Sequence, residues 1–286
     1  MPRSGMEARP YVGCGFHAAP WLKTKEEYEM GYKYAVGLYS VRDELTKDLW
    51  GTLRKIKAMG YDGVEFYGNF SRTAQEIKAA LDETGLVCVG WHTDWSLLTP
   101  ERLLSTVTYN KVIGNTEIVI PWIPEEMRKD KASWLETAKL FSDTAAKLAD
   151  YGLKLAYHNH SEEFEKMNGD VPLYYLYDNT CGVGLQLDNG NALSAGADVD
   201  VYDPLVRYPG KLRTVHHKPY SLKTGFATMI GEDDIDWAKF FKLCREHQNV
   251  EWHIIEYECE EMYGQLEGIE KCIQAIRKLE QEGKIL

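Results

Sequence analysis

Two histidines that stand two residues apart, at the end of an apolar run, are the first residues in this chain that could do chemistry. They are His158 and His160, in the stretch LKLAYHNHSEEF. Because side chains alternate along a β-strand, both imidazoles would point to the same side of a strand that continued through them. The pair could be hydrogen-bonded structural histidines, or one could bind a metal ion while the other transfers protons.

Acidic, imidazole and aromatic side chains also end the other short apolar runs of the sequence. Ionisable groups are seldom buried unless they are paired or bind a metal, so packing does not explain their frequency beside Val, Leu and Ile. The residues at these positions are Tyr39, Glu65, His92, Glu117 or Trp122, Asp188, His216 with His217, and Glu256.

Alternation within the last four runs selects a set of possible metal ligands. Each of these runs offers one such side chain at a matching depth, namely His158 or His160, Asp188, His216 and Glu256. Two imidazoles and two carboxylates would form a neutral site around a divalent ion. Mixed nitrogen and oxygen donors favour Mn²⁺, with Co²⁺, Zn²⁺ or Fe²⁺ as the other possibilities, over Mg²⁺.

The neighbours of these candidate ligands are sorted by the same alternation. Gln186 lies on the same strand face as Asp188, and Thr214 lies on the same strand face as His216. His217 and His253 have the opposite parity, so we expect them to pack beneath helices rather than face the site.

The runs that carry these residues alternate with amphipathic helical patterns, which indicates an α/β fold. The predicted strands cover 34–40, 61–68, 86–92, 116–122, 153–160, 183–190, 212–218 and 250–258. Several of the helical patterns end in a glycine just before the next strand, as Gly60, Gly85 and Gly152 do. Eight strand–helix units predict a (β/α)8 TIM barrel, with a doubly wound open sheet as the alternative. In such barrels the chemistry lies at the carboxyl ends of the strands.

Residues 34–286 are predicted to form a single barrel domain, and residues 1–33 an N-terminal extension that packs on the barrel or on a partner. The net charge of −11 argues against a general nucleic-acid or membrane-surface binder. No apolar stretch approaches the roughly 20 residues that a membrane span needs. The six cysteines lack C-x-x-C spacing and the N-terminus lacks an apolar secretory core, so we expect a cytoplasmic protein with reduced thiols.

An ordered series of motifs runs from about residue 34 to 280: GLYSVRDEL, GYDGVEFYG, AYHNH, LQLDNGNALSAG, VHHK, IGEDDIDW and IIEYE. Together they resemble the sugar isomerase/epimerase family with the xylose-isomerase-like TIM barrel. The resemblance implies one divalent metal held by a residue from each of the last four strands, usually Glu, Asp, His and Glu. Asp188, His216 and Glu256 match the last three positions, and His158 stands where the usual Glu would be.

The histidine at position 158 departs from the family pattern, in which that Glu is commonly both ligand and proton-transfer base. The YHNH variant resembles a branch that includes inosose dehydratase-like proteins and the barrel subunits of C-glycoside deglycosidases. We therefore expect His158 to replace the acidic ligand and His160 to act as acid or base. Two other arrangements stay open, with His160 as the ligand or with three ligands and an open face.

The other candidate residues receive roles from their places at the strand ends. Glu65 is predicted to be a second catalytic base or a substrate contact, with a salt bridge to Arg42 or Lys218 as the alternative. Glu256 is predicted to be catalytic as well as a metal ligand. The predicted substrate-binding residues are Tyr39, His92, Trp122 and Lys218.

These residues favour a metal-dependent sugar isomerase or epimerase, in which the metal stabilises an enediolate formed by proton removal next to a carbonyl. The same enolate would expel a leaving group β to the carbonyl, so a lyase or deglycosidase acting on a 3-keto sugar or a C- or O-glycoside is the alternative. Abasic-site endonucleases with several zincs share the barrel, but the acidic charge counts against them. A metal-free partner subunit is a further alternative. The expected ligand is a small sugar or glycoside, and a homo-oligomer or a hetero-oligomer with a small partner subunit stays open.

Overall fold

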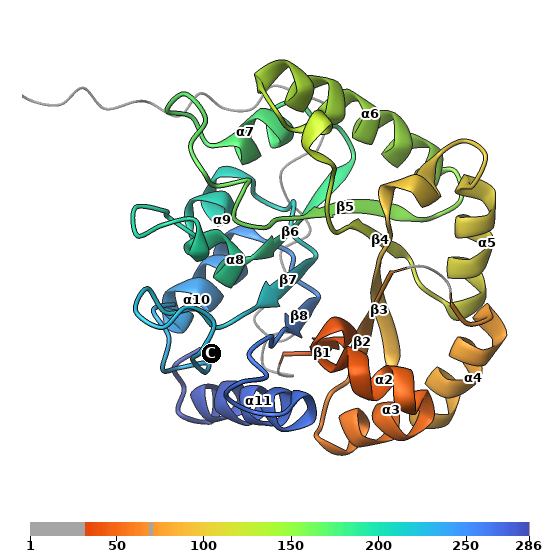
Figure 1. Cartoon of the computed structure of the whole chain (residues 1–286), viewed down its shortest axis with the longest axis vertical. Coiled ribbons are helices and arrows are strands. Elements are labelled where there is room, and N and C mark those ends of the chain that lie inside the picture. The colour runs from red at the N-terminus through yellow and green to blue at the C-terminus, as the bar shows by residue number, and fades with distance from the viewer. Residues whose placement is uncertain (1–31, 69–70, 286) are drawn as a thin grey trace, which may run out of the picture.

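Parallel strands close into a barrel with helices on its outer surface (Figure 1). This computed structural model describes residues 32–68 and 71–285. Within these residues, eight strands pair in sequence order, and β8 pairs with β1 to close the sheet. The strands are β1 (Tyr34–Gly37), β2 (Gly63–Tyr67), β3 (Val87–His92), β4 (Glu117–Ile120), β5 (Lys154–His158), β6 (Val183–Asp188), β7 (Thr214–His217) and β8 (Trp252–Ile255). The predicted (β/α)8 barrel is confirmed, and the open sheet is wrong.

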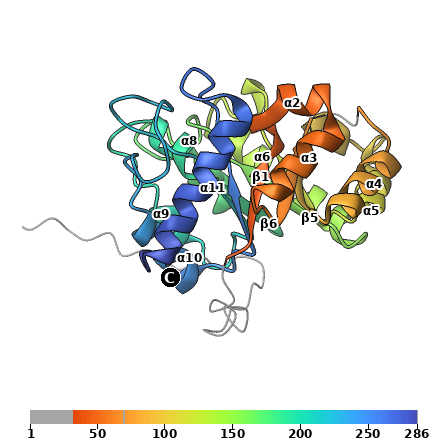
Figure 2. The same ribbon diagram turned by 90° about the horizontal axis from the view of Figure 1, so that it is seen from below.

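The helices that connect the strands shield the outer faces of the sheet. They are α2 (Arg42–Lys47), α3 (Leu49–Ala58), α4 (Ala74–Thr84), α5 (Leu103–Ile113), α6 (Lys131–Ala149), α7 (Pro172–Tyr177), α8 (Asn189–Ser194), α9 (Asp203–Arg207), α10 (Trp237–His247) and α11 (Gln265–Gln281). Short 3-10 turns are η1 (Leu38–Val41), η2 (Trp95–Leu98) and η3 (Glu125–Met127). Figure 2 shows α11, which follows β8, running along the side of the barrel toward the C-terminus.

Local sequence signals set the ends of these helices. Helix α4 begins with a capping box, in which the Thr73 hydroxyl accepts from the backbone N–H of Glu76 and the Glu76 carboxylate accepts from that of Thr73. It ends at Gly85, whose φ of 64° is in the left-handed region. The chain then enters β3 at Val87, two residues after this stop.

Polar side chains end the strands earlier than the apolar runs predict. The predicted strand 153–160 ends at His158. Beyond it, the Asn159 side chain accepts from the backbone N–H of Asp188 at 2.9 Å and donates to its carbonyl at 3.0 Å, which pulls the chain inward. His158 and His160 therefore do not lie on one continuous strand, and the alternation that would align them stops at His158.

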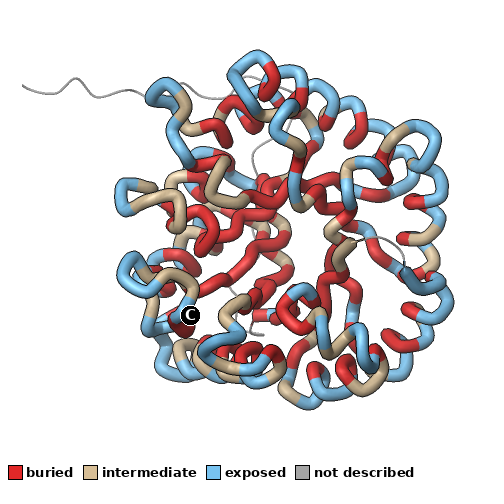
Figure 3. Tube along the Cα trace, in the orientation of Figure 1, coloured by how far each residue is buried: buried red, intermediate tan, exposed pale blue. Residues whose placement is uncertain are grey.

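Apolar side chains fill the molecule in two layers. The larger layer lies between the outer faces of the strands and the helices, and buried residues are concentrated in the strands at the centre of Figure 3. A separate small cluster, Ala35, Val89, Trp252 and Ile254, packs within the barrel. These four come from β1, β3 and β8, and they form an apolar floor beneath the carboxyl ends of the strands.

The two histidines of outward parity pack as the sequence predicts. The rings of His217 and His253 stack at 5.0 Å, with a hydrogen bond of 2.8 Å between His217 Nε2 and His253 Nδ1. Phe241 of α10 stacks on both rings. Their buried position lowers the pKa of His217 to about 3, so this imidazole is neutral and structural.

Only the last two residues of the predicted extension 1–33 are described. The Tyr32 hydroxyl donates to the carbonyl of Ile285 at 2.8 Å, and its ring packs edge-on against Phe241. The remainder of the extension lies outside the described residues, and the domain division stays a prediction. No helix in the described part of the chain is long and apolar enough to cross a membrane.

We expect Gly63→Ala to destabilise the barrel from within. A Cβ at this position would lie 2.5 Å from Val89 Cγ1 and 2.9 Å from the carbonyl oxygen of Val87, and backbone cannot move aside cheaply. Overpacking of this kind costs about 1–3 kcal/mol. Gly184→Ala, in β6, is the matched control, because the nearest atom to a Cβ there is the carbonyl oxygen of Lys211 at 3.4 Å, an ordinary contact distance. Urea unfolding should show a lower midpoint for Gly63→Ala alone, and equal midpoints for the two variants would contradict the packing described here.

Candidate metal centre

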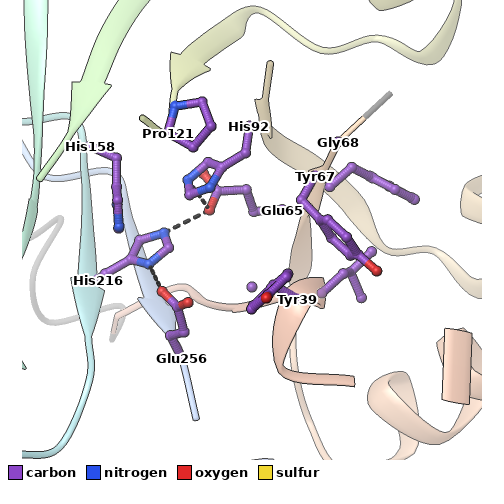
Figure 4. Close-up of a pocket in the computed structure, with 12 residues that line it drawn as sticks. Tyr39, Glu65, Tyr67, Gly68, His92, Pro121, His158, His216 and Glu256 are labelled. Atoms are coloured by element: carbon purple, nitrogen blue, oxygen red, sulfur yellow. Dashed lines mark hydrogen bonds and ion pairs between the residues drawn. The ribbon is translucent and has the colours of Figure 1, made fainter. Parts of the chain in front are cut away.

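A cavity of about 230 Å³ opens at the carboxyl end of the barrel. Its lining residues are Gly37, Leu38, Tyr39, Glu65, Phe66, Tyr67, Gly68, His92, Pro121, His158, His216 and Glu256. Figure 4 shows the imidazoles and carboxylates gathered on one side, with Tyr39 and Tyr67 on the other. The rings of these two tyrosines meet edge-on at 5.2 Å. The cavity thus combines an ionisable wall with an aromatic wall, a combination suited to a small polar ligand that has an apolar face.

Four side chains at the ionisable wall meet as a possible ligand set. His158, Asp188, His216 and Glu256 each offer one nitrogen or oxygen, and these atoms all lie within 4.8 Å of one another. His158 and Asp188 end β5 and β6, His216 lies in β7, and Glu256 directly follows β8. All four residues are buried. The four residues that the sequence singles out are therefore brought together, and their role as ligands stays a prediction.

Asp188 is held in place by its neighbours while one of its oxygens stays free. It caps α8, where its Oδ1 accepts from the backbone N–H of Asn191 at 2.7 Å. Its Oδ2 is buried and has no hydrogen-bond partner among the described residues. That oxygen lies 3.9 Å from both His158 Nε2 and His216 Nδ1.

A buried carboxylate oxygen without a partner is costly, and a cation between these side chains would remove that cost. Burial raises the pKa of Asp188 to about 7, with the Glu256 carboxylate acting in the same direction and Lys218 opposing both. The donors that surround the free oxygen are the imidazole nitrogens and the carboxylate of the other three cluster residues. This donor set and the unpartnered oxygen fit a divalent metal ion.

His216 bridges two carboxylates. Its Nδ1 lies 2.5 Å from Glu256 Oε2, and its Nε2 lies 2.6 Å from Glu65 Oε2 (Figure 4). Burial favours the neutral imidazole, but the two carboxylates outweigh it and raise the pKa of His216 to about 10. Without a metal, the ring therefore carries a proton on the nitrogen that faces the cluster. A cation bound there would take the place of that proton.

His158 is a neutral imidazole. Burial, together with the neighbouring His216 and His92, holds the pKa of His158 well below its usual range. Its Nδ1 lies 3.0 Å from Gln186 Oε1, while its Nε2 is the nitrogen nearer to Asp188. One ring nitrogen is thus engaged beneath the cluster and the other is directed toward it.

His160 lies beside the cluster but is not among the residues that line the cavity. Its ring centroid is 5.1 Å from that of His158, and its backbone N–H donates to Glu163 Oε2 at 2.7 Å. Burial lowers the pKa of His160 to about 4, with Lys218 acting in the same direction. Its Nδ1 is buried and has no hydrogen-bond partner in the described part of the chain. The ring is therefore neutral at pH 7 and able to accept a proton.

Glu65 forms neither of the salt bridges considered from the sequence. Arg42 pairs with Glu260, and Lys218 pairs with Glu258 at 2.5 Å. The buried Glu65 carboxylate instead contacts His216, lies 3.1 Å from His92 Nε2, and accepts from the amide of Gln186 at 2.7 Å. Burial raises its pKa, but the imidazoles of His92 and His216 outweigh burial and hold the pKa of Glu65 well below its usual range.

Two of the four predicted substrate-binding residues line the cavity, and two do not. Tyr39 and His92 line the cavity. Trp122 is half exposed beside Arg128, and Lys218 is buried with its Nζ 3.7 Å from Glu256 Oε1, so neither is part of the lining.

Of the two candidates for the carboxyl end of β4, Glu117 and Trp122, the structure excludes Glu117. Glu117 opens β4, at the amino end of the strand, where it pairs with Arg213 at 2.6 Å and Lys154 at 3.6 Å. As a candidate for the carboxyl end of the strand, Glu117 is wrong. It forms an ion-pair group at the opposite end of the barrel.

Two amides in the site have roles that the sequence reasoning missed. Gln186 contacts three ionisable side chains beneath the cluster, and Asn159 anchors the backbone of Asp188. Gln186 shares a strand face with Asp188, two residues before it, and that parity could have indicated an inward position. Asn159 stands between the two histidines, where nothing in the residue pattern distinguishes it from a loop asparagine.

Comparisons with known proteins agree with this architecture. Residues 53–279 match the family described as xylose isomerase-like TIM barrel. Two similar solved structures are described as sugar phosphate isomerase/epimerases from Parabacteroides distasonis ATCC 8503. One is 18% identical and covers 87% of this chain and 98% of its own, with a TM-score of 0.73. The other is 20% identical and covers 90% of this chain and 96% of its own, with a TM-score of 0.72.

A solved L-ribulose 3-epimerase is 14% identical and covers 88% of this chain and 95% of its own, with a TM-score of 0.60. At these identities, the structural likeness shows the fold alone. A comparison with curated protein sequences gives no match.

The proton on His216 predicts that the metal-free protein loses stability as pH rises above 7. The pKa of His216 is about 10 in the folded chain, against an ordinary value of 6.5, so its stabilising proton is retained only by the folded state at pH 7 to 8.5. Because the folded state holds one more proton than the unfolded state, the free energy of unfolding falls by about 1.4 kcal/mol for each unit by which the pH rises. Glu65→Gln removes one of the two carboxylates that hold the proton and should flatten this dependence.

Urea unfolding in the presence of a chelator, at pH 7 and at pH 8.5, measures the effect in both proteins. Asp188 and Asp233, whose pKa values are raised to about 7 in the folded chain, also lose protons over this interval, so the difference in slope between the wild type and Glu65→Gln is the measure of His216. A wild-type free energy of unfolding that is the same at both pH values would show that His216 is not protonated as described.

Proposed function

This chain belongs to the xylose isomerase-like TIM barrel family, and from that membership we propose that it is a divalent-metal-dependent sugar isomerase or epimerase. The observation that carries the proposal is the buried cluster of His158, Asp188, His216 and Glu256, with one Asp188 oxygen left unpartnered. Similar solved structures are described as sugar phosphate isomerase/epimerases and as L-ribulose 3-epimerase, which supports the same reaction class.

The four cluster residues would hold the metal, for which Mn²⁺ is the first choice and Co²⁺, Zn²⁺ or Fe²⁺ are the others. When bound, such an ion polarises a sugar carbonyl and stabilises the negative charge that develops on its oxygen. A sugar would enter from the cavity side, with its apolar face toward Tyr39 and Tyr67 and its hydroxyls toward His92. Stacking of a sugar ring on aromatic side chains would orient its reactive carbons toward the ionisable wall.

Proton transfer is assigned to His160, which is neutral at pH 7 and lies next to the cluster. It would remove the proton from the carbon next to the carbonyl and return it to the neighbouring carbon, which isomerises the sugar. Return of a proton to the opposite face of the same carbon epimerises it. Glu256, which contacts His216 and lies near Lys218, is the second proposed acid–base group.

No specific observation favours the other functions considered from the sequence. The two possible ligand groups found among the described residues share His158 and His216, so they form one centre.

We expect the protein purified without chelator to contain about one equivalent of divalent metal, and Asp188→Ala to lose it. His160→Gln should keep the metal and lose proton transfer by roughly 10²–10⁴-fold, the usual contribution of a general acid–base group. Elemental analysis measures the metal. Exchange of carbon-bound hydrogen in D₂O, followed by NMR over a panel of free ketoses and their phosphate esters, measures proton transfer whichever product is formed.

The outcomes separate the parts of the proposal. Absence of metal in the wild type, with none taken up on addition, would rule out the metal-dependent function. Metal retention in Asp188→Ala would place the ion elsewhere. Wild-type exchange rates in His160→Gln would transfer the acid–base role from His160 to Glu256.

A further inference from the structure

Directly beneath the four-residue cluster, a single amide joins three ionisable groups of the site. Gln186 is fully buried in β6, two residues before Asp188. Its Oε1 lies 2.8 Å from His92 Nε2 and 3.0 Å from His158 Nδ1. Its Nε2 lies 2.7 Å from Glu65 Oε1 and 3.0 Å from Thr214 Oγ1. A primary amide has two donor hydrogens and two acceptor lone pairs, so its capacity is fully used here.

Chemistry fixes which end of this amide faces which partner. An ionised carboxylate can only accept hydrogen bonds, so the NH₂ group of Gln186 must face Glu65. The amide oxygen must then face the two imidazoles, and both imidazoles must donate to it. The reversed amide would set oxygen against oxygen at Glu65, and it would offer the imidazoles donors instead of an acceptor.

This orientation determines where His158 carries its proton. If His158 donates from Nδ1 to Gln186, its single proton is on that nitrogen and the lone pair is on Nε2. Nε2 is the nitrogen that lies 3.9 Å from the unpartnered oxygen of Asp188. The ring is thereby aligned, in the correct tautomer, as a nitrogen donor toward the cluster.

We infer that Gln186 is a positioning residue that makes a histidine at position 158 competent as a metal ligand, by holding its proton on Nδ1. This inference rests on the proposed function, in which the cluster binds a metal. The inference also makes the role of Gln186 depend on a histidine at position 158, because a carboxylate there would have no proton to donate to the Gln186 oxygen. Partners of this kind typically change metal affinity by 10–100-fold when they are removed.

The first test reads the tautomer directly in the metal-free protein. Long-range ¹H–¹⁵N correlations of ¹⁵N-labelled histidine distinguish a proton on Nδ1 from one on Nε2, and the His158→Gln variant identifies the signals of His158. We expect Nδ1–H in the wild type and a shift to Nε2–H, or to a mixture, in Gln186→Met. Thr214→Val is the matched control, since it removes the other contact of the amide nitrogen and leaves the oxygen facing His158. An unchanged His158 tautomer in Gln186→Met would overturn the inference.

The second test is a double-mutant cycle on metal affinity, measured by calorimetry with Co²⁺. Gln186→Met should weaken binding by 10–100-fold in the wild-type background. In the His158→Glu background it should weaken binding by no more than about twofold, because the glutamate has no proton for Gln186 to hold. An equal loss in both backgrounds would show that Gln186 acts only through general packing or through Glu65.

The two readouts also separate this inference from the proposed function. If the wild type takes up no Co²⁺, the metal-dependent function fails, while the tautomer measured in the metal-free protein still decides the role of Gln186. If metal binds but the tautomer is independent of Gln186, the function stands and the inference fails.

Discussion

The interior of the barrel mouth has to neutralise several buried charges, and most of the site follows from that constraint. Carboxylates taken out of water are costly unless opposite charges and hydrogen bonds compensate them. Glu65 is buried and compensated by His216, His92 and Gln186. Such a fully satisfied network is rigid, because the movement of one member leaves another unpaired. Asp188 Oδ2 has no hydrogen-bond partner among the described residues, which is why the centre of the cluster is the place where a cation fits.

Small residues make room for this polar layer above the apolar floor. A Cβ at Gly90 would lie 2.7 Å from Glu65 Oε1, so a larger residue there would displace the carboxylate. The strand pairing of β2 with β3 shifts register between Val64 and Glu65, next to that contact. On the other side of the site, a Cβ at Gly190 would lie 2.3 Å from the carbonyl oxygen of Lys218. Glycines in strands and short helices thus serve the positions of charged side chains rather than flexibility.

The fold and the cluster could be predicted from the sequence because both depend on short-range patterns. Strands that are buried on both faces appear as apolar runs, and an ionisable residue at the end of such a run is conspicuous, as Asp188 and Glu256 are. Glu117 shows the limit of this reasoning, since it begins its run instead of ending it. The role of Gln186 could not be predicted, because its partners His158 and Glu65 lie 28 and 121 residues away in the sequence and an amide carries no charge to draw attention.

The electrostatics of the site also explain why a neutral ligand at position 158 is compatible with a divalent ion. In the metal-free protein at neutral pH, Glu65 and Glu256 are ionised, His216 and Lys218 are protonated, and the raised pKa of Asp188, about 7, allows it to hold a proton. Loss of the protons from Asp188 and His216 lowers the net charge of the site by two, a deficit of two positive charges. One divalent cation supplies that deficit. The exchange of two protons for one divalent cation keeps the metal-free and metal-bound states at the same net charge, and the imidazole of His158 adds no further negative charge to either state.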